Sequence, residues 1–93
     1  MFDAKYLQDA LEQLKGQREH LANATRVLEA IICQCSSIAR SAPVTRIREV
    51  AMRCRDSAIT AYAKSVADPG AIGELLEETI AGLEGELATS QRA

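Results

Sequence analysis

A line of apolar residues at seven-residue intervals constrains the fold of this chain more than any other feature. The five positions of the line are Leu7, Leu14, Leu21, Leu28 and Cys35. Heptad spacing keeps side chains on one side of an α-helix, so the line predicts a single long helix over about residues 3 to 40. That helix is longer than any helical segment that follows it. Its apolar side therefore exceeds what the rest of the chain can cover.

Two proline-containing breaks divide the chain of 93 residues into helical segments. Pro43 ends the first segment, and Asp68 with Pro69 ends the second, because proline disfavours helical geometry in the residue before it and suits the first turn of a new helix. The predicted helices cover about residues 3 to 40, 43 to 67 and 70 to 89. We therefore expect one all-α domain over residues 1–93, a three-helix bundle or helical hairpin, with a possible bend of the long first helix at Gly16.

The second predicted helix has apolar residues on two sides. One side is a seam of mostly small residues, formed by Val44, Ile47, Ala51, Cys54, Ala58, Ala61 and Ser65. The other side consists of Met52, Ile59, Ala63 and Val66. A helix that is apolar on two faces is usually covered on both. This pattern predicts a central position for the second helix in the bundle.

Charge differs between the helices, although the net charge of the chain is only −2. The second predicted helix has an excess of arginine, with Arg46 and Arg53 on one side of its seam and Arg48 and Arg55 on the other, whereas the third is acidic. We expect ion pairs between these two helices to guide their pairing. The low net charge and the lack of aromatic residues among the basic ones argue against a nucleic-acid partner.

The start of the first helix is the predicted partner-binding region. If the second helix folds back from Pro43, it reaches only to about residue 17. The apolar side chains left beyond it are Phe2, Tyr6, Leu7, Leu11 and Leu14. Three arrangements cover them: pairing with a second copy, docking of a different protein, or folding back at Gly16 into a four-helix bundle within one chain. The strict heptad favours self-association, as a homodimer, with hetero-assembly second and the closed monomer third.

Residues that could carry chemistry are few. Cys33 and Cys35 point to nearly opposite sides of a helix and cannot share a metal ion, so we expect no metal site and no cofactor. Cys35 and Cys54 fall on apolar lines, while Cys33 faces the polar side. His20 is the only histidine. A histidine phosphotransfer-like protein or another small all-α enzyme that uses His20 or Cys33 is the alternative to a binding protein.

Together these patterns predict a non-enzymatic protein–protein interaction module, a self-associating helical adaptor or a small chaperone-like protein. No stretch approaches the roughly 18 apolar residues of a membrane span. Three cysteines, an odd number, suit a reducing compartment rather than a disulfide framework, so a cytoplasmic location is expected.

Overall fold

The computed structural model describes residues 4–42 and 45–92. All regular secondary structure in this part of the chain is helical. The elements are α1 (Ala4–Gly16), a 3-10 turn η1 (Gln17–His20), α2 (Ala24–Ser41), α3 (Thr45–Ala63) and α4 (Pro69–Arg92). The all-α prediction is confirmed, but the count of three helices is wrong. Four α-helices form a bundle, because the segment predicted as one long first helix forms two helices, α1 and α2.

The break in the predicted first helix lies between Gly16 and Ala24. The chain tightens into η1 after Gly16 and then turns at Asn23, which has non-helical backbone angles (φ −109°, ψ 83°) and accepts a hydrogen bond from the backbone N–H of Arg26 on its side-chain oxygen (3.2 Å). Asparagine is among the best N-cap residues because its side chain satisfies an orphan N–H of the first turn. The continuous helix over residues 3 to 40 is therefore wrong, and Asn23 starts a new one.

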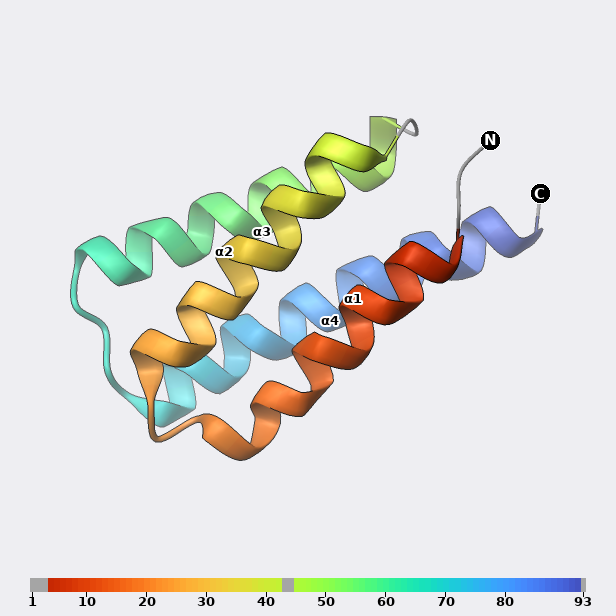
Figure 1. The fold of residues 1–93 in the computed structure, drawn as a ribbon. Coiled ribbons are helices and arrows are strands. Elements are labelled where there is room, and N and C mark those ends of the chain that lie inside the picture. The colour runs from red at the N-terminus through yellow and green to blue at the C-terminus, as the bar shows by residue number, and fades with distance from the viewer. Residues whose placement is uncertain (1–3, 43–44, 93) are drawn as a thin grey trace.

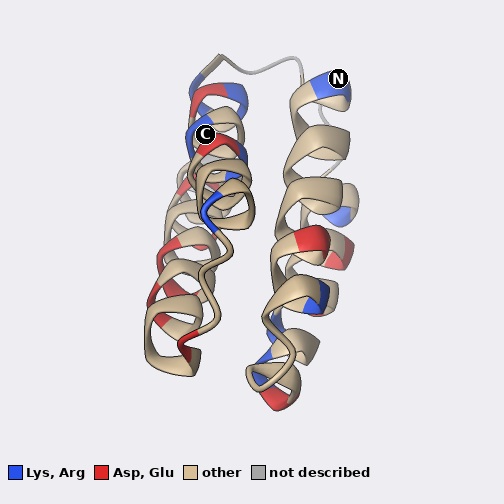
Figure 2. Ribbon diagram, turned by 90° about the vertical axis from the view of Figure 1, so that its left-hand side faces the viewer, with Lys and Arg blue, Asp and Glu red and all other residues tan. Residues whose placement is uncertain are grey.

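The four helices run alternately up and down, and α1 and α2 form one layer against α3 and α4 (Figures 1 and 2). Each helix contacts its two neighbours around the bundle, and the most extensive pairing is between α2 and α3. Across the diagonals, the backbone of α2 lies closer to that of α4 than the backbone of α1 lies to that of α3. This arrangement puts α3 at a corner of the bundle rather than at its centre.

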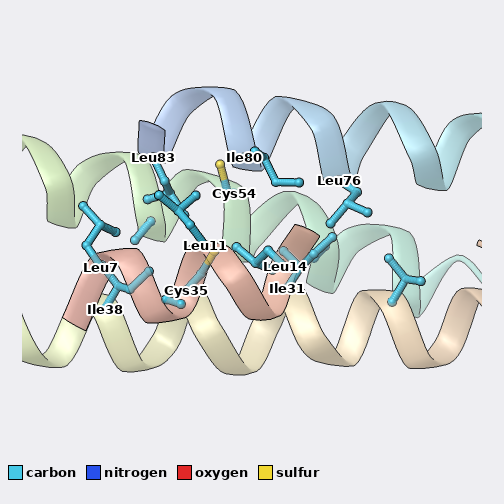
Figure 3. Packing of buried hydrophobic residues seen from close by; sticks show 14 of the residues in the cluster. Leu7, Leu11, Leu14, Ile31, Cys35, Ile38, Cys54, Leu76, Ile80 and Leu83 are labelled. Atoms are coloured by element: carbon cyan, nitrogen blue, oxygen red, sulfur yellow. The ribbon is translucent and has the colours of Figure 1, made fainter. Parts of the chain in front are cut away.

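The core runs through the middle of the bundle and takes side chains from all four helices (Figure 3). Its largest fully buried residues include Leu7, Leu14, Leu28, Ile31, Ile38, Ile47, Ile72, Leu76, Ile80 and Leu83. The seam predicted on residues 43 to 67 is buried at Ile47, Ala51, Cys54 and Ala58. The heptad line thus lies inside its own chain, because bending at residues 17–23 returns α1 to the bundle.

Helix α4 begins and ends close to the predicted bounds of 70 and 89. Asp68 caps it: its carboxylate oxygens accept hydrogen bonds from the N–H groups of Gly70 and Ala71, each at 3.3 Å. Pro69 occupies the first helical position, where its missing N–H has no cost. The glycine at position 82 serves packing, because a Cβ there would lie only 3.1 Å from Val50 Cγ1 on α3.

The end of α3 turns sharply on a serine. The N–H of Val66 donates to the carbonyl of Ala61 (3.0 Å) and that of Ser65 to the carbonyl of Tyr62 (3.1 Å), which is the Schellman pattern of helix termination. Ser65 has a φ of 56°, a left-handed conformation that costs a non-glycine residue roughly 1 kcal/mol. The turn directs the chain away from α3 and towards the cap of α4.

Most ion pairs of the acidic helix α4 go to the α1 and η1 segment rather than to α3. Arg18 forms a two-pronged pair with Glu77 (2.6 and 2.7 Å), and Lys15 pairs with Glu84 (2.9 Å). The predicted pairing of the basic and acidic helices is represented by Arg46 and Glu86 at 3.7 Å. The Arg18–Glu77 pair links the turn between α1 and α2 to α4, so it helps to hold the folded-back segment in place.

We expect the Arg18–Glu77 pair to make stability depend on pH. The hydrogen bond from Arg18 lowers the pKa of Glu77, so the pair contributes fully above the ordinary glutamate pKa of about 4.3 and is lost as the pH falls through the lowered value. In Glu77→Gln, the loss of unfolding free energy between neutral and acid pH should be smaller. Both side chains are about half exposed, so the effect is modest. Urea unfolding at both pH values measures it, with the exposed neighbour variant Glu78→Gln as control.

Candidate interaction surface

The predicted partner-binding residues of the first segment lie mainly inside the bundle. Leu7, Leu11 and Leu14 are at most 3% exposed and belong to the core cluster to which all four helices contribute. Phe2 lies outside the described residues. The burial of the three leucines removes the observation on which the predicted partner surface rested, namely that this segment lacks cover within its own chain.

Tyr6 lies at the edge of that segment and joins α1 to α2. The residue is 37% exposed, and its hydroxyl group shares a hydrogen bond with the hydroxyl of Ser37. The Ser37 hydroxyl, together with the side chain of Ser41, lowers the pKa of the Tyr6 phenol. The polar end of Tyr6 therefore has a partner within the chain.

The largest exposed apolar side chains gather instead on the outer side of α3. Among the residues that the structure describes, four large hydrophobic side chains are exposed, and three of them are on this helix: Met52 (39%), Ile59 (45%) and Tyr62 (47%). Met52 and Ile59 are one heptad apart, and Tyr62 follows Ile59 by one turn, so the three share a side of the helix. We call them the α3 stripe. The predicted central position of this helix is wrong, because the second apolar side of α3 faces solvent.

Charged residues flank the line through Met52 and Ile59 on both sides. At 100° per residue, Arg48 and Arg55 fall on the side of Met52 and Ile59 that is nearer the buried seam residue Ala51, and Asp56 falls on the opposite side with Glu49. Arg55 contacts its neighbour Asp56 at 3.2 Å, and the guanidinium of Arg48 donates to the carbonyl of Ala42 (2.9 Å). An apolar line with a basic border and an acidic border is the pattern of a helix that pairs with another helix.

An open hollow adjoins one end of the stripe. It has a volume of about 650 Å³ and lies where the start of α2 meets the end of α3. Its lining residues are Ala22, Asn23, Ala24, Thr25, Leu28, Tyr62, Ser65, Val66 and Ala67. They include hydroxyl and amide groups but no Asp, Glu, Lys, Arg or His. Since Tyr62 belongs to both features, the hollow and the stripe form one continuous surface.

The three cysteines are free and lie as their positions on the helices predict. Cys35 and Cys54 are buried in the core, and burial raises the pKa of the Cys35 thiol to about 12. A thiol with such a pKa is a poor nucleophile at neutral pH. Cys33 is exposed, which leaves it as the accessible thiol of the chain.

His20, the other residue considered for chemistry, ends η1 and is half buried. Its carbonyl oxygen accepts a hydrogen bond from the N–H of Asn23 (2.8 Å), so its backbone is part of the turn that starts α2. In the described ranges 4–42 and 45–92, no group of three or more His, Cys, Asp and Glu residues is placed to hold a metal ion.

Two further findings concern membrane-spanning helices and similarity to known proteins. No helix in the part of the chain that the structure describes combines the length and the apolar composition needed to cross a bilayer. Comparison with protein-family models, with curated proteins and with solved structures gives no significant match to the chain.

The residues of the α3 stripe do carry a signal in the sequence. Met52 and Ile59 belong to the predicted second apolar side of residues 43 to 67, and that pattern by itself predicts a buried face. Tyr62 lies off this line, so the pattern does not include it. Its position one turn after Ile59 and seven residues after Arg55 places it beside Ile59, on the arginine side of the line.

Proposed function

We propose that this protein is a non-enzymatic protein–protein interaction module that binds its partner through the α3 stripe. The observation that carries the proposal is the concentration of exposed apolar side chains on one side of one helix, in a bundle whose other large apolar residues are mostly buried. Single exposed apolar residues are ordinary on protein surfaces, so the proposal rests on three of them sharing one helix rather than on any one of them.

The energetics support a contact of moderate strength. Complete burial of a large aliphatic side chain is worth about 1.5 to 3 kcal/mol, and the three stripe residues are between 39% and 47% exposed. Each therefore stands to gain roughly 1 kcal/mol when a partner covers it. A contact of this size suits an adaptor or a chaperone-like protein that binds and releases.

The proposal gives no catalytic role to His20 or Cys33. The half-buried His20 belongs to a structural turn, and the hollow beside Tyr62 has no acid, base or histidine in its lining. We place the protein in the cytoplasm, since its three cysteines are unpaired and thiols persist in a reducing compartment.

Site-specific photo-crosslinking in the source organism tests the proposal. A benzophenone side chain in place of Ile59 should yield a covalent adduct with a protein on irradiation, because the stripe is covered by a partner there. The matched control is the same group in place of Glu78, an exposed position on α4. Absence of an adduct at position 59, or equal yields at both positions, would contradict the proposal.

A further inference from the structure

We infer that the partner of the α3 stripe is a second copy of this chain, with the two α3 helices side by side and parallel around a twofold axis. The inference rests on the proposed function and adds the identity and orientation of the partner. Its basis is the charge pattern along α3, where Arg48 and Arg55 lie on one side of the line through Met52 and Ile59, and Glu49 and Asp56 lie on the other.

The geometry of the stripe makes it self-complementary in one orientation. On a helical projection, Arg55 lies about 50° to one side of the line through Met52 and Ile59, and Asp56 lies about 50° to the other. A twofold axis parallel to two facing helices brings opposite borders together. Arg55 of each copy then meets Asp56 of the other at nearly the same height, while Met52 and Ile59 pack against their own counterparts.

The antiparallel orientation lacks this complementarity. A twofold axis perpendicular to the helices brings like borders together, so Arg55 faces the arginine border of the second copy and Asp56 faces its acidic border. Like charges across a helical interface oppose pairing. The charge pattern therefore selects the parallel dimer.

The contacts within one chain leave this arrangement available. The Arg55–Asp56 contact joins adjacent residues whose side chains are 29% and 65% exposed, and pairs near the surface are worth at most about 1 kcal/mol. Both groups keep unused hydrogen-bonding capacity, since a guanidinium has five N–H donors and a carboxylate has several acceptor sites. Arg48 is held by the carbonyl of Ala42, so the decisive charges are those of Arg55 and Asp56.

Charge reversal tests the inference on the purified chain by sedimentation equilibrium from micromolar to millimolar concentration. We expect wild type to shift towards the mass of two chains with increasing concentration. Arg55→Glu and Asp56→Arg should each weaken association about tenfold, because each turns two attractive contacts into repulsive ones. An equimolar mixture of the two variants, and the double variant R55E/D56R, should both recover wild-type association.

Orientation is tested by cysteine crosslinking in a Cys33→Ser background. In the parallel dimer, Met52→Cys lies opposite its own counterpart, so oxidation should join two chains of this variant. In the antiparallel dimer, position 52 lies opposite position 59, and crosslinking would instead require a mixture of Met52→Cys and Ile59→Cys chains. Circular dichroism and urea unfolding on every variant check folding, since positions 52, 56 and 59 are exposed but the Arg55 side chain is only 29% exposed.

The outcomes separate the inference from the function on which it rests. A monomeric wild type, a mixture no stronger than its components, or crosslinking through position 59 alone would overturn the parallel dimer. If the chain is monomeric while the crosslinker at Ile59 captures a different protein, the interaction function stands and the second copy is excluded. If no adduct forms at Ile59 at all, both fall.

Discussion

Leu14→Ala is expected to destabilise the folded monomer by about 2 to 5 kcal/mol, the cost of truncating a fully buried leucine in a core that relaxes only in part. Leu14 is 0% exposed and packs in the cluster shared by the four helices. Small domains have only about 5 to 15 kcal/mol of total stability, so this change removes a large share. Urea unfolding followed by circular dichroism measures the loss, which should not depend on protein concentration.

The matched control for this prediction is Ile59→Ala on α3. Ile59 is 45% exposed, and its truncation should change the unfolding free energy of the monomer by less than about 0.5 kcal/mol. If Leu14 instead served only an intermolecular contact, Leu14→Ala would leave monomer stability unaltered and change the concentration dependence alone. That result would contradict the closed four-helix bundle.

Ala58→Leu is expected to destabilise the bundle by about 1 to 3 kcal/mol through overpacking. Ala58 is 0% exposed on the small-residue seam of α3, the helix that pairs most extensively with α2. Adding three carbons there forces the helix apart from its neighbours or drives side chains off their preferred rotamers. Thermal and urea unfolding should both report the loss.

The control for Ala58→Leu is Ala81→Leu, the same substitution at an exposed position of α4. It should alter stability by no more than a few tenths of a kcal/mol, since both residues are good helix formers and neither is packed there. Equal effects at the two positions would show that helix propensity, rather than close packing of α3, determines the result.

Much of this fold could be predicted from residue spacing and local chemistry. The capping acid and proline at Asp68 and Pro69 predict the start of α4, and the small residues between Ile47 and Ala58 predict a buried seam. These features are local, because each depends on a few neighbouring residues and on the periodicity of one helix. The confirmed elements are those whose sequence signals lie within one helical turn or along one face of a single helix.

The break at residues 17–23 could not be located in the same way. A glycine inside a helix costs only about 1 kcal/mol and does not by itself end it, and the heptad of leucines continues through the turn. The choice between one long helix and two depends on the burial of Leu7 and Leu14 against α4, a contact distant in sequence. Asn23 as an N-cap was the local sign of a new helix start.

The exposed side of α3 could not be predicted for a related reason. Met52 and Ile59 have the spacing of a buried face, and a helical pattern alone does not say how many neighbours surround a helix. Once α1 folds back beside α2 and α4, the bundle closes with α3 at a corner. The apolar residues that need a partner then lie on α3 instead of α1.

Sedimentation equilibrium of wild type and Ile59→Asp, at matched concentrations, tests most directly the claim that α3 carries the intermolecular contact. The account predicts that wild type approaches the mass of two chains as concentration rises. Ile59→Asp should keep the mass of one chain throughout, and at concentrations where wild type is also monomeric the two should unfold at the same urea concentration, because residue 59 is exposed in the monomer. A wild type of one-chain mass at every concentration, or an Ile59→Asp variant that associates as wild type does, would contradict it.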